Sequence, residues 1–222
     1  KYDSNGDNVW PNTQPITTGS GQAAPANFFE ISGGEYIAVF HQLIGGINSN
    51  LYAQRYDGDG MAPWVNATQL SDNNTAFNRG YEGTQNDDAV FMSYFGPTGN
   101  QFNNYLQRVN LDGTLPWGIN GSDFSTNVTE NESASLIAIN QDASAIYAVA
   151  TYSNSNQSMN GEFIQKFDTT TGARLFTDAA KEVYAIGEEK VHAGSMYLLG
   201  DKPWFLIKNG ADNGATPTTL EA

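Results

Sequence analysis

Short apolar runs separated by Gly-, Asn- and Ser-rich loops recur along the whole chain. Four of these runs are "EYIAVFHQ" (35–42), "DAVFMSYF" (88–95), "SAIYAVATY" (144–152) and "SMYLLGD" (195–201). Short apolar runs that are bounded by turn residues predict β-strands. Only residues 178–190 have a helix-like composition, and we expect strand and loop there too. The pattern therefore predicts an all-β fold with four short strands in each of its units.

A second set of runs leads into glycine turns at a nearly constant spacing. The runs are "LYAQRYDGDG" (51–60), "NYLQRVNLDG" (104–113) and "EFIQKFDTTTG" (162–172), and the chain opens on "KYDSNG". The turn glycines are Gly6, Gly60, Gly113 and Gly172, followed by Gly214 in an eroded copy that has Lys208 in the place of Lys166. A fixed period of roughly 50 residues is the signature of a repeat array.

The turn residues indicate a β-hairpin in each repeat. An Asp or Asn side chain bonds to its own backbone there, and the glycine adopts the positive φ that closes the turn. An aromatic residue stands four positions after the glycine, on the expected closing strand, and we predict that its ring packs between neighbouring sheets while an indole N–H meets a loop carbonyl. These aromatic residues are Trp10, Trp64, Trp117 and Phe176, and the glutamines that precede the turns are Gln54, Gln107 and Gln165.

The repeat divides the chain into six parts. Residues 1–16 are the outer hairpin of a partial blade, 17–71, 72–125 and 126–178 are full blades, 179–214 form a shortened blade, and 215–222 are a linker. Five turns accompany only four sets of preceding strands. We therefore expect residues 1–10 to be an orphan hairpin whose inner strands come from elsewhere, for example from further repeats of a larger β-propeller.

The repeat resembles one that occurs in secreted surface proteins of Bacteroidetes and some other bacteria, which reads approximately "YaQrlDxxGxxxW". The best matching segments are "LYAQRYDGDGMAPWVNATQLS" (51–71) and "NYLQRVNLDGTLPWGINGSDFS" (104–125), and the weaker copies cover most of the remaining chain. The hairpin is also similar to the docking strand of quinoprotein-like propeller blades. The resemblance implies a β-propeller-like fold and export through a type IX secretion route. Fold alone does not dictate chemistry.

Composition excludes several classes of partner. The chain of 222 residues has 24 acidic and 10 basic residues, a formal charge of −14. Such an acidic chain is a poor ligand for nucleic acids, which are bound by Lys and Arg, and for anionic membranes. The sequence has no cysteine, which excludes disulfides and thiolate metal sites. No apolar stretch approaches the roughly 20 residues that span a bilayer. We expect no cofactor.

The acidic turns are weak candidates for a calcium site. The candidate oxygen ligands are Asp3, Asn5 and Asp7 in the first turn and Asp57 and Asp59 in the second. An EF-hand requires glycine at its sixth position and glutamate at its twelfth, but counting from Asp3 these positions hold Asn8 and Gln14. We therefore expect hairpin turns rather than a metal site.

Neither acidic pairs nor histidines predict a catalytic centre. Asp87 with Asp88, and Glu188 with Glu189, are adjacent in sequence, and neighbours on a strand point to opposite faces. His41 and His192 lie in different units with no partner nearby in sequence, and we expect both to be ordinary half-buried or surface residues.

Aromatic residues near the polar loops are the remaining candidates for a ligand site. Exposed rings beside Asn and Asp would suit stacking on a sugar or on a protein partner, whereas buried rings would pack between blades. The candidates are Tyr81, Tyr94, Phe95, Phe102 and Tyr152.

These observations favour a non-catalytic binding or scaffold module of a secreted or cell-surface protein, such as an adhesin or a component of a surface complex. Its partners would be a protein or glycan ligand and further repeats of the same polypeptide or another subunit. A secreted hydrolase or lyase that acts on polysaccharide is the first alternative. A structural spacer is the second.

Overall fold

The computed structural model describes residues 1–10, 22–45, 48–76, 81–209 and 220–221, and these residues form an all-β protein. Within the described residues the only helical element is a single 3-10 turn, η1 (Ser32–Gly34), and all other elements are strands. The prediction of an all-β fold is therefore confirmed. The helix-like segment 178–190 contains the strand β12 (Lys181–Tyr184), as expected.

The described strands form four antiparallel sheets, which follow one another along the chain. Sheet 1 contains β1 (Ala23–Ile31), β2 (Glu35–Ile44), β3 (Asn48–Tyr56) and β4 (Thr68–Gln69). Sheet 2 contains β5 (Gly83–Gln85), β6 (Ala89–Thr98), β7 (Gln101–Asn110) and β8 (Ser122–Asp123). Sheet 3 contains β9 (Asn131–Ile139), β10 (Ala145–Ser153), β11 (Asn160–Asp168) and β12. Sheet 4 contains β13 (Lys190–Leu199), β14 (Lys202–Asn209) and β15 (Leu220–Glu221).

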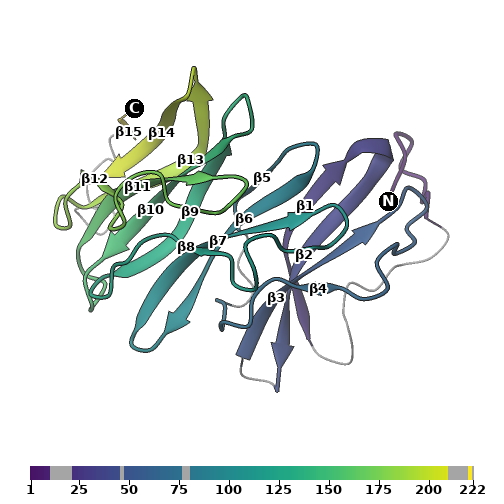
Figure 1. The fold of residues 1–222 in the computed structure, drawn as a ribbon, viewed down its shortest axis with the longest axis horizontal. Coiled ribbons are helices and arrows are strands. Elements are labelled where there is room, and N and C mark those ends of the chain that lie inside the picture. The colour runs from purple at the N-terminus through teal and green to yellow at the C-terminus, as the bar shows by residue number, and fades with distance from the viewer. Residues whose placement is uncertain (11–21, 46–47, 77–80, 210–219, 222) are drawn as a thin grey trace.

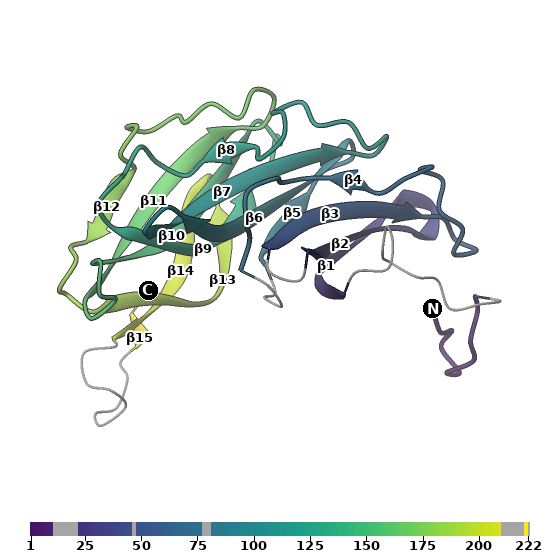
Figure 2. The same cartoon turned by 90° about the horizontal axis from the view of Figure 1, so that it is seen from below.

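The four sheets lie side by side with their faces toward one another. Figure 1 shows them in chain order from sheet 1 near the N-terminus to sheet 4 near the C-terminus. In Figure 2 the short fourth strands β4, β8 and β12 lie along the upper rim of the array. The sheets therefore form a curved row in which each inner sheet has two neighbours.

The hydrophobic core consists of three clusters, one in each gap between neighbouring sheets. Val39 and Met92 belong to the cluster between sheets 1 and 2, and Phe91 and Ile146 to the one between sheets 2 and 3. Leu136 and Met196 belong to the cluster between sheets 3 and 4. The second strands β6 and β10 are buried on both faces. This double burial explains their near-continuous apolar sequences, because a strand with a solvated face alternates instead.

Sheet 4 differs from the predicted arrangement. The sequence suggested that "FLIKNG" (205–210) is the strand that leads into the last glycine turn. In the structure β13 follows β12 directly and lies against β9, β10 and β11, just as β9 lies against β5, β6 and β7. β13 therefore takes the first place in its sheet and β14 the second. The continuous apolar run of β14 is consistent with a second strand, and the proposed turn at Gly214 falls outside the described residues.

Two local features refine the predicted repeat. Trp64 and Trp117 lie in the loops before the closing strands, not on them, since β4 begins at Thr68 and β8 at Ser122. Residues 1–10 form a small hairpin through an isolated antiparallel bridge between Tyr2 and Asn8, outside the four sheets.

Candidate functional site

The recurring turns have the backbone geometry that their sequences predict. Gly6, Gly60, Gly113 and Gly172 have φ values of 85°, 81°, 88° and 74°. This left-handed region is costly for residues with a β-carbon, so glycine is the favoured residue at these positions. In the second turn the Asp57 carboxylate accepts hydrogen bonds from the backbone N–H groups of Asp59 at 3.0 Å and Met61 at 2.8 Å.

Each tryptophan of the repeat docks on the glycine turn of the next unit. The indole Nε1 of Trp10 donates to the Gly58 carbonyl at 3.0 Å, that of Trp64 to Leu111 at 3.2 Å, and that of Trp117 to Thr170 at 3.3 Å. All three rings are partly buried. The prediction that these rings pack between neighbouring units and bond a loop carbonyl is thus confirmed. Phe176, which takes the fourth place, instead contacts the ring of Tyr147.

Carbonyl groups of the same turns also accept hydrogen bonds from the arginines that follow the repeat glutamines. Arg55 Nη1 donates to the Leu111 carbonyl, and Arg108 Nη1 donates to that of Thr169, both at 2.8 Å. The sequence pattern did not predict this contact, although "QR" precedes both Gly60 and Gly113 by the same number of residues.

Each repeat glutamine connects its strand to the closing loop of its own unit, and Gln107 Nε2 also donates to the Leu70 carbonyl of the preceding unit at 2.7 Å. Gln54 Nε2 donates to Trp64 O at 3.3 Å, Gln107 Nε2 to Gly118 O at 3.0 Å, and Gln165 Nε2 to Thr177 O at 2.8 Å.

The acidic turns use their side-chain oxygens for backbone hydrogen bonds. Asp3 Oδ1 accepts from the N–H groups of Asn5 at 2.8 Å and Asp7 at 2.9 Å, as Asp57 does in the second turn. Among the described residues no group of three or more His, Asp or Glu side chains is placed to hold a metal ion. The geometry of these turns is that of hairpins.

Three of the five aromatic candidates are core residues. Tyr81, Tyr94 and Tyr152 are only 3%, 0% and 2% exposed, so their rings do not offer the exposed surface that stacking on a ligand requires. Their large flat rings fill the space between the sheets, where sequence position near a loop suggested exposure. Phe95 and Phe102 are partly buried and contact each other with ring centroids 5.9 Å apart.

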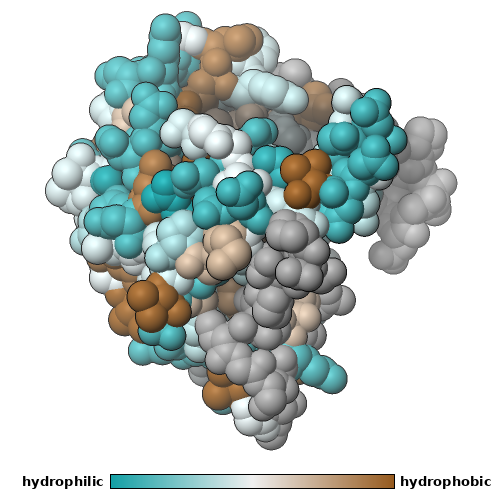
Figure 3. All heavy atoms as spheres, turned by 90° about the vertical axis from the view of Figure 1, so that its right-hand side faces the viewer, coloured by the Kyte–Doolittle hydropathy of each residue, from teal (hydrophilic) through white to brown (hydrophobic). Residues whose placement is uncertain are grey.

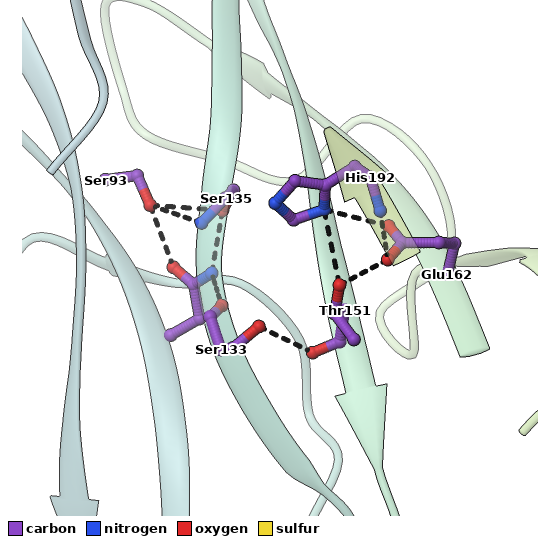
Figure 4. A network of polar contacts seen from close by, with 7 residues as sticks. Ser93, Ser133, Ser135, Thr151, Glu162 and His192 are labelled. Carbon is purple, nitrogen blue, oxygen red and sulfur yellow. Dashed lines mark hydrogen bonds and ion pairs between the residues drawn. The ribbon is translucent and has the colours of Figure 1, made fainter. Parts of the chain in front are cut away.

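A polar cluster between sheets 3 and 4 joins an acid, a histidine and a threonine (Figure 4). His192 Nδ1 lies 3.1 Å from Glu162 Oε2, and the His192 backbone N–H donates to Oε1 at 3.0 Å. The hydroxyl of Thr151 bonds to the same carboxylate and lies 3.3 Å from His192 Nδ1. His192 is partly buried, as expected, and its partner Glu162 comes from β11 of the preceding sheet, 30 residues away in sequence.

A second polar cluster lies at the matching place between sheets 2 and 3. Asn104 Nδ2 donates to Ser135 Oγ at 2.7 Å, and Ser93 Oγ donates to the same oxygen at 3.1 Å. Asn104 occupies the same position in its third strand as Glu162 does in sheet 3 and Leu51 in sheet 1. Alignment of the three third strands, which would have shown a Glu at a position that is apolar or amide elsewhere, could have identified Glu162 from sequence.

A further buried acid, Glu132, accepts three hydrogen bonds. Ser125 Oγ donates at 2.6 Å, Tyr152 Oη at 2.8 Å and the Asn104 backbone N–H at 3.0 Å. Burial raises the pKa of the Glu132 carboxyl, and the three donors oppose this rise only in part. His41 is fully buried beside Ser49 and Thr75, with Nδ1 3.2 Å from Thr75 Oγ1, so the expectation of a half-buried or surface histidine is wrong for this residue. The buried side chains of Glu132 and His41 thus connect different segments of the core through hydrogen bonds.

An open cavity of about 420 Å³ lies at one end of sheet 3. Phe163 and Tyr152, stacked with centroids 4.1 Å apart, form part of its wall. Asn127, Glu130 and Glu182 supply polar groups around it. Neither Glu162 nor His192 lines this cavity.

Comparison with models of known protein families gave no match, and comparison with curated proteins gave none either. In the described part of the chain no helix is long and apolar enough to cross a membrane.

Proposed function

We propose that the four sheets are consecutive blades of a β-propeller-like array. Three features support this proposal: the four-stranded antiparallel sheets, their face-to-face packing, and the repeated docking of a tryptophan on the next turn. The array is a non-catalytic binding or scaffold module of a secreted or cell-surface protein. Its partners are a protein or glycan ligand and further repeats of the same kind.

The burial of the acid–histidine cluster is the observation that favours a scaffold over an enzyme. Glu162 is 0% exposed, and both of its oxygens are engaged by Thr151 and His192. A general acid or base must lie within hydrogen-bond reach of a substrate proton. A carboxylate enclosed between two sheets is instead suited to connecting them.

A glycan or peptide ligand would fit best at the cavity on sheet 3. Its wall combines the partly buried ring of Phe163 with the amide of Asn127 and the carboxylates of Glu130 and Glu182. Ligand pockets typically combine apolar surface with a few polar groups that fix orientation. An acidic rim would favour a neutral or cationic ligand over a polyanion.

The substitution Glu162→Gln distinguishes the scaffold from a polysaccharide hydrolase or lyase. The protein and the variant are incubated with a panel of neutral and uronic-acid polysaccharides, and reducing ends and unsaturated products are measured. We expect no product from either protein, together with a lower melting temperature for the variant. Product formation that disappears in Glu162→Gln, with the melting temperature unchanged, would establish the enzyme instead.

The binding proposal has its own test at the cavity. A glycan array and a peptide library are screened with the protein and with Phe163→Ala, with Val65→Ala as a matched control because Val65 is 96% exposed and far from the cavity in sequence. We expect ligands that Phe163→Ala loses and Val65→Ala retains. Ligands that both variants retain would place the binding surface elsewhere.

A further inference from the structure

The cavity at the end of sheet 3 has an aromatic wall whose orientation is fixed from behind. Phe163 is partly buried, and its ring stacks on that of Tyr152 with the two planes 19° apart. Tyr152 is only 2% exposed, and its hydroxyl donates to the buried Glu132 carboxylate at 2.8 Å. Of the two stacked rings, that of Phe163 is therefore the one that a ligand in the cavity can reach.

A carboxylate lies beside this ring. Glu182 on β12 is directly opposite Phe163 on β11 in the register of sheet 3, so the two side chains share one face of the sheet. Glu130 lines the same cavity. Among the described residues neither carboxylate takes part in an ion pair, and none of the lining residues is basic. The cavity therefore combines an aromatic surface with negative charge that these residues do not neutralise.

Contacts elsewhere in the chain show how a basic side chain sits on such a ring. Lys181 Nζ lies 4.5 Å from the ring centroid of Phe176, and Lys166 Nζ lies 4.7 Å from that of Tyr147. Lys181 precedes Glu182 on β12 and so points to the other face of the sheet. Its ammonium group therefore occupies a different ring and leaves that of Phe163 to a ligand.

The ring of Phe163 departs from the repeat in a way that suits this chemistry. Stacked aromatic pairs occupy the same place in the first two sheets, and they are Phe40 with Tyr52 and Tyr94 with Tyr105. Two residues before the repeat glutamine the third strand thus carries tyrosine in sheets 1 and 2 and phenylalanine in sheet 3. The Tyr105 hydroxyl lies 2.9 Å from Thr98 Oγ1, whereas Phe163 has no hydroxyl and presents only its ring.

Negative charge alone does not define a site on this molecule. The chain has a formal charge of −14, and many hydrophilic side chains, with separate hydrophobic patches, cover the end of the molecule that Figure 3 shows. A field of this kind attracts cations weakly to much of the surface. The feature that distinguishes the cavity is the Phe163 ring next to Glu182, because the negative face of an aromatic ring attracts a cation at short range.

We infer that this cavity binds an organic cation, the ammonium or guanidinium group of a basic side chain or of a free amine. The cation lies against the Phe163 ring and pairs with the Glu182 and Glu130 carboxylates. The apolar stem of a lysine or arginine side chain packs on the same wall, since these side chains bury their stems and keep the charged group near polar partners. This inference rests on the proposed function, because it assigns a class of ligand to the cavity proposed there.

Calorimetric titration with matched peptides tests the charge of the ligand. The peptides are Gly-Gly-X-Gly-Gly with blocked ends, where X is Lys, Arg, norleucine or Glu. We expect the Lys and Arg peptides to bind, the norleucine peptide to bind at least about tenfold more weakly, and the Glu peptide not to bind. Butylammonium and butylguanidinium are titrated in parallel. Equal affinity of these ions would identify a free amine as a sufficient ligand, and binding of the peptides alone would identify a basic side chain of a polypeptide.

Three variants locate the binding. Phe163→Leu keeps an apolar side chain but removes the aromatic face, and should weaken the Lys peptide by about twofold to thirtyfold, the range of cation–π contacts. Glu182→Gln removes one charge and should weaken it by about twofold to fivefold. Asp59→Asn removes one charge at an exposed residue of the second glycine turn and should leave the affinity unchanged. Circular dichroism and melting curves show whether each variant is folded.

Three results would overturn the cation site. They are equal affinity for the norleucine and Lys peptides, no binding of any peptide or amine, and an equal effect of Asp59→Asn and Glu182→Gln, which would mean that the cation responds to the general charge of the protein. None of these results decides the proposed function. A neutral glycan or peptide that Phe163→Ala loses would retain the cavity as a binding site, and only the absence of every ligand that depends on Phe163 would refute both.

Discussion

A β-carbon placed on Gly172 would lie 2.9 Å from Cδ2 of Trp117, although the two residues belong to different repeats of the chain. The same relationship joins Trp10 to Gly60 at 2.7 Å and Trp64 to Gly113 at 3.2 Å. The glycine therefore has two roles in the repeat. It permits the positive φ of the turn, and its missing side chain leaves room for the indole of the preceding unit.

The double role of the turn glycine predicts a graded effect of alanine. Gly99→Ala introduces a β-carbon at φ 63° with no other atom within 4 Å, so it carries only the cost of the left-handed backbone, roughly 1–2 kcal/mol. Gly172→Ala has a similar φ of 74° and adds a clash with the Trp117 ring and the Ser122 hydroxyl. We expect Gly172→Ala to lower the free energy of unfolding by clearly more than Gly99→Ala in urea titrations. Equal losses would contradict the close packing of the ring.

Removal of the docking ring should destabilise the fold less than removal of a fully buried one. Trp→Ala in a core costs about 3–5 kcal/mol, and Trp64 is only partly buried. We therefore expect Trp64→Ala to cost about 2 kcal/mol in the free energy of unfolding. Val65→Ala, at the adjacent and 96% exposed position, is the control and should change the value by less than about 0.5 kcal/mol. A melting curve of Trp64→Ala that overlays the wild type would mean that the ring contributes nothing.

Glu162 of sheet 3 and His192 of sheet 4 should contribute to the free energy of unfolding as an energetically coupled pair. Glu162→Gln and His192→Gln each disturb a hydrogen-bonded group in the core, and residues in direct contact are non-additive in double-mutant cycles. We expect the double variant to be less destabilised than the sum of the two single variants, by about 0.5–3 kcal/mol. Strict additivity in the same urea titrations would show that the pair does not act as a unit.

The buried Glu132 predicts a stability that falls as the solution becomes less acidic. Its pKa is raised by burial above the usual Glu value of 4.5, so the folded protein binds the proton more tightly than the unfolded chain does. The stabilising contribution of the protonated form is complete below pH 4.5 and is lost as the pH rises through the raised pKa. Glu132→Gln should flatten this part of the profile, measured as the free energy of unfolding at a series of pH values. A variant profile with the wild-type slope above pH 4.5 would assign the effect to another group.

Hydrogen-bonded turn aspartates act in a different pH range. The N–H and hydroxyl groups of Thr171 lower the pKa of Asp168, and those of Thr114 lower the pKa of Asp112. A lowered pKa gives stability that is present above the ordinary Asp value and lost as the pH falls through the folded value. The loss of stability that comes from these aspartates therefore occurs at lower pH than the change that comes from Glu132.

Local rules of sequence predicted the strands, the turns and the docking of the tryptophans. The turn requires an Asp or Asn side chain, a glycine and an aromatic residue four positions after the glycine, and all of these lie within a few residues of one another. Because this short pattern recurs at a nearly constant spacing, the repeat could be recognised from the sequence. The place of β14 was not predictable in this way. Its sequence "FLIKNG" is similar to the motif of the third strand. Only the contact of β13 with β9 shows that β13 is the first strand of its sheet, so that β14 is the second.

The polar clusters depended on contacts between sheets, which sequence spacing does not reveal. His192 and Glu162 are 30 residues apart on strands of different sheets, so neither residue marks the other. The aromatic candidates failed for a related reason. Tyr94 stands near a loop in sequence, yet its side chain points into the gap between sheets 1 and 2, where it packs with Tyr105 at 5.1 Å between centroids.

Hydrogen exchange of the indole N–H groups tests the docking of neighbouring units most directly. The chain has four tryptophans, and single Trp→Phe variants assign their indole signals in a proton–nitrogen NMR spectrum. We predict that the Trp64 indole proton, which is bonded to the Leu111 carbonyl of the next unit, exchanges much more slowly than that of Trp204, whose side chain is 48% exposed. Exchange of the Trp64 proton at the rate of the Trp204 proton would contradict the docked arrangement.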